Sequence, residues 1–191
     1  MHDPIIESIS EQIEGETATL CVNDRVVGAS VGIVRDQELV WSRGFGFADL
    51  DSGRPPDLHT VFRIASVTKT FTATALFQLR DEGKLSLDDP LLTYVPEFAN
   101  AKAKEGSVEG VTLRRLLCHH SGLMAEAPGD EPYWSQMGFP GIEEIIAATS
   151  RIEVVIEQDS AFKYSNLGFA LLGEVVSRVS GRRYEDYVTE E

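Results

Sequence analysis

Ser66 and Lys69 lie three residues apart at the predicted start of a helix, in the order Ser-Val-Thr-Lys. Residues i and i+3 of a helix share one face, with Cβ atoms about 5 to 6 Å apart. A serine hydroxyl becomes a useful nucleophile when a neighbour takes its proton, and a lysine can do so when burial or a nearby cation lowers its pKa. The helix start also presents free N–H groups, that of Ser66 among them, to a developing oxyanion. This pair therefore predicts attack on a carbonyl.

The Ser-x-x-Lys spacing is weak evidence when it stands alone. With 15 serines and 5 lysines in 191 residues, about 0.4 matches are expected by chance. A second match, Ser160 with Lys163, opens no long apolar helix, and we interpret it as coincidence. An isolated match would be read as a helix N-cap serine and a solvent-exposed lysine.

Tyr164-Ser165-Asn166 precedes another apolar helix and is the stronger signal, because only about 0.08 Tyr-x-Asn matches are expected by chance. A tyrosine beside an ammonium group can have a lowered pKa and can carry the serine proton to a leaving group. An asparagine amide can donate to and accept from a substrate amide, although Asn166 could also be a simple helix cap. The two motifs together favour a catalytic role for Ser66, Lys69 and Tyr164.

The order of these motifs resembles the serine β-lactamase and penicillin-binding protein family, which includes class C β-lactamases, D-alanyl-D-alanine carboxypeptidases and related esterases. The similarity runs from about residue 28 and includes four further stretches: Phe62 to Ala65, Leu116 to Leu123, Tyr164 to Phe169, and Leu171 to Gly173. It implies an α+β, β-lactamase/transpeptidase-like fold, in which helices flank an antiparallel sheet and a second part is mostly helical.

The resemblance also implies a role for each residue. Ser66 would be the nucleophile, Lys69 and Tyr164 would handle its proton, and Asn166 would bind the substrate amide, with no metal and no organic cofactor. The substrate stays open among a β-lactam, a D-amino-acid peptide and a small ester, because these chemistries share one constellation and differ in pocket shape.

The chain departs from the family in two places. Gln158-Asp159-Ser160 replaces the Pro-Gly pair that usually precedes the tyrosine, which is expected to alter that loop. The third motif, Lys or His followed by Ser or Thr and Gly, does not follow Tyr164, and Val179-Ser180-Gly181 lacks its cation. We therefore expect residues 1–191 to form one catalytic domain that is incomplete at its C-terminus and lacks the last strands. The alternative is a truncated or degenerate, non-catalytic member of the family that acts as a binding or interaction module.

Three other patterns imitate functional sites. Ser30 lies in a Gly-x-Ser-x-Gly match, but the sequence after it predicts a hairpin and not the helix that a nucleophile elbow needs. His119 and the His120-Ser121-Gly122 triplet lack metal-ligand spacing and precede the tyrosine motif, so we expect structural roles. Asp88 and Asp89 are expected in a solvated turn.

The apolar pattern predicts the elements that position these groups. We expect an amphipathic helix over residues 4–14, then a strand, a turn and a second strand over residues 28–41. Further helices are expected over 66–80, 111–118, 141–149 and 167–179 and from Tyr184 onward, with 152–156 extended and 125–140 a surface loop. The stripe Val67, Phe71, Ala75 and Leu79 predicts that the helix over 66–80 is buried.

Composition narrows the function classes. A formal net charge of -14 without a basic cluster argues against nucleic acid and anionic lipid as partners. The N-terminus lacks a basic start followed by an apolar run, and no segment is apolar over the length of a bilayer, so we expect a cytoplasmic protein without a membrane span. Cys21 and Cys118 are expected to be reduced and partly buried. The oligomeric state stays open.

Overall fold

The computed structural model describes residues 3–128 and 139–191, which excludes most of the loop expected over 125–140. The chain divides into two compact units, Met1–Arg63 and Ile64–Glu191.

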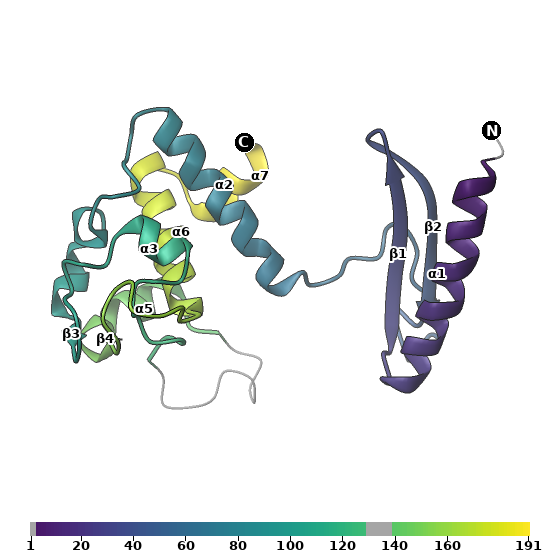
Figure 1. The fold of residues 1–191 in the computed structure, drawn as a ribbon, viewed down its shortest axis with the longest axis horizontal. Helices are drawn as coiled ribbons and strands as arrows, with labels where there is room; N and C mark the ends of the chain where they lie inside the picture. The colour runs from purple at the N-terminus through teal and green to yellow at the C-terminus, as the bar shows by residue number, and fades with distance from the viewer. Residues whose placement is uncertain (1–2, 129–138) are drawn as a thin grey trace. The chain divides into compact units, whose positions relative to one another are not determined.

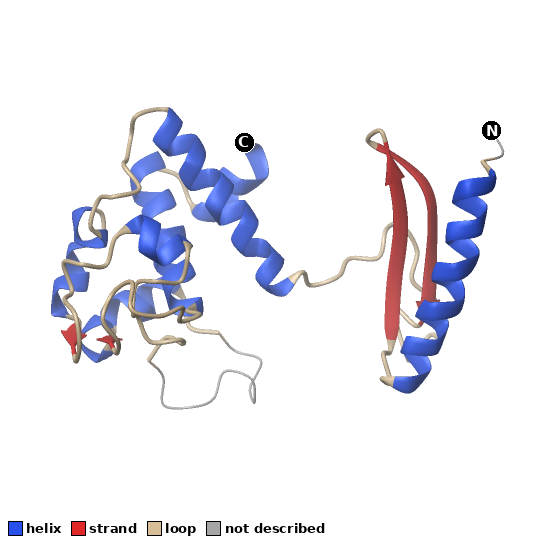
Figure 2. Cartoon of the chain, in the orientation of Figure 1, coloured by secondary structure: helices blue, strands red, loops and turns tan. Residues whose placement is uncertain are grey.

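The N-terminal unit is a helix that lies along a β-hairpin (Figures 1 and 2). Asp3 caps α1 (Pro4–Asn23) by accepting from the Ile5 N–H, with Pro4 in the first turn. Helix α1 extends beyond the predicted residues 4–14. The predicted hairpin is confirmed as β1 (Gly28–Arg35) paired antiparallel with β2 (Glu38–Gly46).

Ion pairs link α1 to the hairpin. Arg35 binds Asp3 and Arg43 binds Glu14, each with a nitrogen to oxygen distance of 2.5 Å. The turn between the strands is made by Asp36 and Gln37, both with positive φ. Two consecutive positive-φ residues match the right-handed twist of a two-residue hairpin.

The C-terminal unit is mostly helical (Figure 2). Its elements are η1 (Ala65–Val67), α2 (Thr68–Asp81), η2 (Leu91–Thr93), η3 (Pro96–Asn100), β3 (Lys102–Ala103), α3 (Leu113–Leu117), α5 (Ile142–Ala147), η4 (Thr149–Arg151), β4 (Glu153–Val154), α6 (Asn166–Ser180) and α7 (Tyr184–Glu190). Strands β3 and β4 form a short parallel pair.

The hydrophobic core lies within this second unit, where α2 packs on α6. The helix predicted over residues 167–179 is confirmed as α6, and its Leu167, Leu171 and Val175 are buried. Gly181 ends α6 with φ of 71°, a conformation that glycine adopts without strain. Thr72 and the Tyr184 hydroxyl lie 2.7 Å apart and join α2 to α7.

Two burial predictions are wrong. On α2, Ala75 and Leu79 are buried, but Val67 and Phe71 are 58% and 48% exposed, because only the later turns of the helix contribute to the core. Both cysteines are free as expected, yet Cys118 is exposed. It caps the C-terminal end of α3, beyond the inward-facing Leu113 and Leu116.

Candidate active site

Ser66 lies in the 3-10 turn η1 that leads into α2. Ala65, immediately before it, has φ of 43°, which is unusual for a residue with a side chain. The Val67 N–H donates to the Ile64 carbonyl at 3.0 Å and closes the turn. The strained backbone at Ala65 thus precedes the exposed Ser66 side chain at the beginning of the helix. Backbone strain of this kind often occurs at functional sites.

The structure brings all four predicted site residues together. The Ser66 Oγ lies 2.8 Å from the Tyr164 Oη, and the Lys69 Nζ donates to the same Oγ at 3.3 Å. The Lys69 Nζ also donates to the Asn166 Oδ1 at 2.7 Å. The hydroxyl that would attack a carbonyl therefore contacts two groups that can exchange protons with it.

The local electrostatics favour an easily ionised tyrosine. The Lys69 ammonium, followed by the Ser66 hydroxyl, lowers the pKa of the Tyr164 phenol from its ordinary value. The Lys69 Nζ lies 4.8 Å from the centre of the Tyr164 ring and 5.4 Å from that of Phe169. The Lys69 ammonium therefore lies close to two aromatic rings. Its positive charge stabilises the phenolate form of Tyr164.

Glu126 is a site residue that the sequence reasoning missed. Its Oε1 accepts from the Asn166 Nδ2 at 2.8 Å, while the Asn166 Oδ1 accepts from Lys69. The carboxylate therefore fixes the orientation of the amide, because only the NH₂ group can donate to it. No motif indicated Glu126; its part in the site follows from the path of the loop after Ser121.

Ser165 anchors the tyrosine motif from within. It is buried, its Oγ donates to the Met124 carbonyl at 2.7 Å, and the same oxygen accepts from the Gly168 N–H at 2.9 Å. Ser165 is therefore the N-cap of α6, one residue before the Asn166 cap considered from the sequence. The Asn166 N–H donates to the Ala125 carbonyl at 2.7 Å and ties the motif to the same loop.

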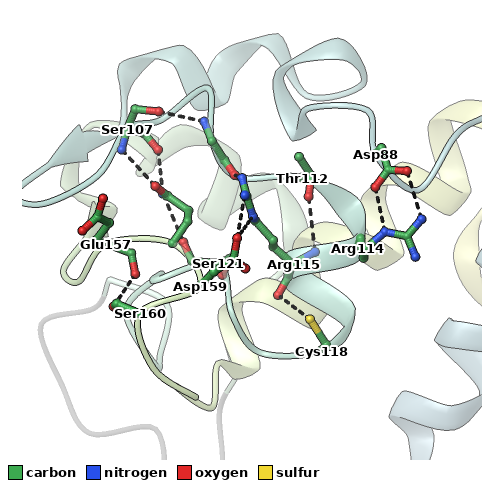
Figure 3. A network of polar contacts seen from close by, with 12 residues as sticks. Asp88, Ser107, Thr112, Arg114, Arg115, Cys118, Ser121, Glu157, Asp159 and Ser160 are labelled. Atoms are coloured by element: carbon green, nitrogen blue, oxygen red, sulfur yellow. Dashed lines mark hydrogen bonds and ion pairs between the residues drawn. The ribbon is translucent and has the colours of Figure 1, made fainter.

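The segment that replaces the Pro-Gly pair is held by polar contacts (Figure 3). Asp159 has φ of 62°. Its Oδ2 accepts from the Arg115 guanidinium at 2.6 and 2.9 Å, and its N–H donates to the His120 carbonyl. The Gln158 amide both donates to and accepts from the Ser107 backbone. These contacts hold in place the loop that precedes Tyr164, although this loop lacks the Pro-Gly pair.

Gly122 joins the loop after α3 to the segment that contains β4. Its carbonyl accepts from the Val155 N–H at 2.8 Å, and its φ is 74°. A Cβ atom at this position would lie 2.1 Å from the Ile156 carbonyl oxygen, which is far inside contact distance. The close approach therefore requires glycine.

The imitating patterns have structural roles. Ser30 lies within β1 opposite Gly44, with a second strand following. Ser160 donates its hydroxyl to the Glu157 carbonyl at 2.6 Å. Asp88 pairs with Arg114, and Asp89 accepts from the Tyr94 hydroxyl.

Neither a metal cluster nor a membrane-spanning helix occurs in the described part of the chain. Within residues 3–128 and 139–191, no group of three or more His, Cys, Asp or Glu residues could hold a metal ion. Within the same residues, none of the helices is long and apolar enough to cross a membrane.

Comparison with known proteins identifies the family. Residues 9–191 match the family model described as Beta-lactamase. Beta-lactamase-like protein 2 of Dictyostelium discoideum is 33% identical over 192 residues, which cover 99% of this chain and 35% of the relative. The chain thus spans about a third of the length of the curated relatives it matches.

Solved structures with the same fold include the following two. The octameric penicillin-binding protein homologue from Pyrococcus abyssi is 31% identical with a TM-score of 0.79, covering 95% of this chain and 41% of that one. A class C β-lactamase mutant is 25% identical with a TM-score of 0.78, covering 97% of this chain and 49% of that one. These matches confirm the expected α+β, β-lactamase/transpeptidase-like fold. The chain belongs to the Beta-lactamase family of serine hydrolases.

Proposed function

We propose that Ser66 is the nucleophile of a hydrolase that acts on amide or ester carbonyls through an acyl-serine intermediate. The observation that carries the proposal is the contact of the Ser66 Oγ with the Tyr164 Oη at 2.8 Å and with the Lys69 Nζ at 3.3 Å. A hydroxyl placed against a phenol of lowered pKa and an amine has the partners that nucleophilic catalysis needs.

In the proposed reaction, the Ser66 Oγ forms a bond to the substrate carbonyl carbon while its proton passes to Tyr164 in its phenolate form or to Lys69 in its neutral amine form. The tetrahedral intermediate collapses when the bond to the leaving nitrogen or oxygen breaks, and the same proton goes to that leaving atom. Water then attacks the serine ester by the same route and releases the acid with a free Ser66. The Ser66 N–H would stabilise the oxyanion from the helix start.

Asn166 is proposed to bind the substrate amide, and this binding would weaken or replace its hydrogen bond to Glu126. Its Nδ2 already donates to Glu126, and its Oδ1 accepts from Lys69. A substrate carbonyl would have to share or replace the Glu126 carboxylate as the acceptor of that donor. A β-lactam, a D-amino-acid peptide and a small ester all remain substrates for this proposal, and the class C β-lactamase among the structural matches supports the first.

We further propose that the two units belong to one catalytic domain whose remaining strands lie beyond these residues. The matched relatives are about two to three times longer than the aligned region. Large apolar side chains are also exposed on both units, among them Val34 and Leu39 of the hairpin and Phe71 and Phe77 of α2. Further strands packed on these surfaces would bury them.

Active-site labelling tests the proposal. The protein at its natural length is incubated with a fluorophosphonate or a fluorescent penicillin, and its intact mass is measured. We expect one adduct that disappears in Ser66→Ala and persists in Ser160→Ala, the matched control from the second Ser-x-x-Lys pattern. The absence of any adduct, or an adduct that survives Ser66→Ala, would contradict the proposal and favour the non-catalytic binding module.

A further inference from the structure

His119 lies immediately after α3, where the chain turns towards Tyr164. Its φ is 61°, and its N–H donates to the Leu116 carbonyl at 3.2 Å. Its carbonyl accepts from the Lys163 N–H at 2.8 Å, one residue before the tyrosine. The backbone of His119 is therefore fixed against the segment that contains Tyr164.

The His119 side chain makes a contact that specifies its protonation state. Its Nδ1 lies 3.2 Å from the Ser165 backbone nitrogen, which carries a hydrogen and can only donate. The Nδ1 atom must therefore be unprotonated, and the ring is the neutral form with its hydrogen on Nε2. A protonated imidazole would direct an N–H against the N–H of Ser165 and would break this bond.

The same ring supports the Tyr164 ring. The two ring centres are 4.4 Å apart with an interplanar angle of 36°. Phe169 and Phe162 complete the surroundings of His119 at 5.2 and 5.5 Å. One imidazole thus packs against the tyrosine and accepts from the backbone of the next residue, which restricts the direction of the Tyr164 hydroxyl.

The charges around His119 disfavour its protonation. Lys69 reaches the cluster from α2, His120 adjoins it on the same loop, and Tyr164 faces it from the segment before α6. Glu126, the carboxylate of the candidate site, is engaged with Asn166. Burial first, then Lys69 and His120, lower the pKa of His119 from its ordinary value of 6.5.

We propose that His119 is a positioning residue: its neutral ring, bound to the Ser165 N–H and packed on Tyr164, keeps the phenol oxygen on Ser66, and protonation of the ring releases it. The inference rests on the proposed function of Ser66 and Tyr164. The reaction then requires two deprotonated groups. One is the base that accepts the Ser66 proton, and the other is the His119 ring.

The pH dependence of Ser66 labelling tests this role. On the acid side (the acid limb) of the pH–rate profile, each additional group that must be deprotonated makes the labelling rate fall by a further factor of about ten per pH unit. We expect the wild-type limb to steepen below the midpoint of His119 titration. In His119→Asn the limb should stay shallow, because the Asn Oδ1 can replace Nδ1 as acceptor, tolerates positive φ and does not titrate.

His120→Asn is the matched control. The Nδ1 of His120 lies near the Cys118 carbonyl and not near Ser165, so its removal should leave the wild-type steepening in place. An acid limb with the same slope in wild type and His119→Asn would overturn the inference, as would a shallow limb in His120→Asn.

A measurement without catalysis separates this inference from the proposed function. In Ser66→Ala, nuclear magnetic resonance should show the Ser165 amide and Tyr164 ring signals shifting with the same midpoint as the His119 ring. Signals that do not move with His119 would overturn the positioning role, whatever the labelling shows. The absence of labelling at every pH would instead contradict the proposed function alone.

Discussion

The nucleophile segment, residues 64–69, and the tyrosine segment, residues 158–166, both supply residues to the candidate site but are held by different contacts. In the nucleophile segment every side chain except that of Lys69 is exposed, and its long-range polar contacts are those of Ser66 and Lys69 with the site itself. In the tyrosine segment, Ser165 is buried and the backbone binds residues 119–125.

Because of this difference, we expect some substitutions to lower mainly the reaction rate and others to lower mainly the free energy of unfolding. Replacing Ser66 or Lys69 in the nucleophile segment removes a reacting group and little packing. Replacing an anchor of the tyrosine segment leaves buried polar groups without partners, which costs folding free energy. Substitutions at four positions test the contrast.

Lys69→Met should give the largest effect. It keeps a long apolar chain among the rings and removes the charge that contacts Ser66 and Tyr164. The rate of Ser66 labelling should fall by about 10²- to 10⁴-fold. An ultraviolet titration of the phenol should show the pKa of Tyr164 rising towards its ordinary value of 10.0, since Lys69 is the main cause of its lowering. Unchanged labelling and an unchanged titration would contradict the role of Lys69.

Tyr164→Phe should slow labelling by about 10²-fold, at the lower end of the effect of a proton-transferring group. The ring that packs on His119 stays, and only the hydroxyl that contacts Ser66 at 2.8 Å is lost. The free energy of unfolding, from urea titration, should change little. A large loss of stability would place Tyr164 among the anchors instead.

Ser165→Ala should have the opposite profile. It removes the N-cap of α6 and the donor to the partly buried Met124 carbonyl. The free energy of unfolding should fall by about 1 to 2 kcal/mol. Labelling of the folded fraction, measured well below the transition, should stay within a few-fold of wild type. A fall in the labelling rate comparable to that of Tyr164→Phe would break the distinction between reacting groups and anchoring residues.

The smallest effect is expected at Asp159. Both Asp159→Ala and Asp159→Gly lose the partly exposed pair with Arg115, worth less than about 1 kcal/mol. Only alanine also keeps a Cβ atom at φ of 62°. We expect urea titrations to show Asp159→Gly more stable than Asp159→Ala by about 1 kcal/mol. Equal stabilities would mean that the left-handed conformation is not strained in this loop.

The local sequence pattern predicted helices and strands well where nearby residues determine the backbone conformation. Small, β-branched and apolar residues on both sides of a polar turn predicted the hairpin, and Gly181 marks the end of α6 with φ of 71°. Helix α1 was predicted too short because its apolar stripe ends near Gly15, a poor helix former, although the helix continues. The exposure of Phe71 was missed because periodicity shows which residues share a face and not what covers it.

The candidate site was predictable only in part for a related reason. Ser66, Lys69, Tyr164 and Asn166 belong to motifs whose order in the chain is informative. Glu126 and the position of His119 depend on how a loop after α3 passes beside Ser165, which is a contact between residues about 40 positions apart. Spacing within a motif carries no information about such a contact.

Gly122 limits how this scaffold could be changed by directed evolution. Any side chain there would collide with the Ile156 carbonyl, so the loop that carries His119 and Glu126 would separate from the segment leading to Asp159. Random mutagenesis aimed at new substrates would lose such variants as insoluble protein before their selectivity could be assayed. A library that leaves codon 122 fixed and varies the exposed residues around Ser66 would keep a larger share of folded clones.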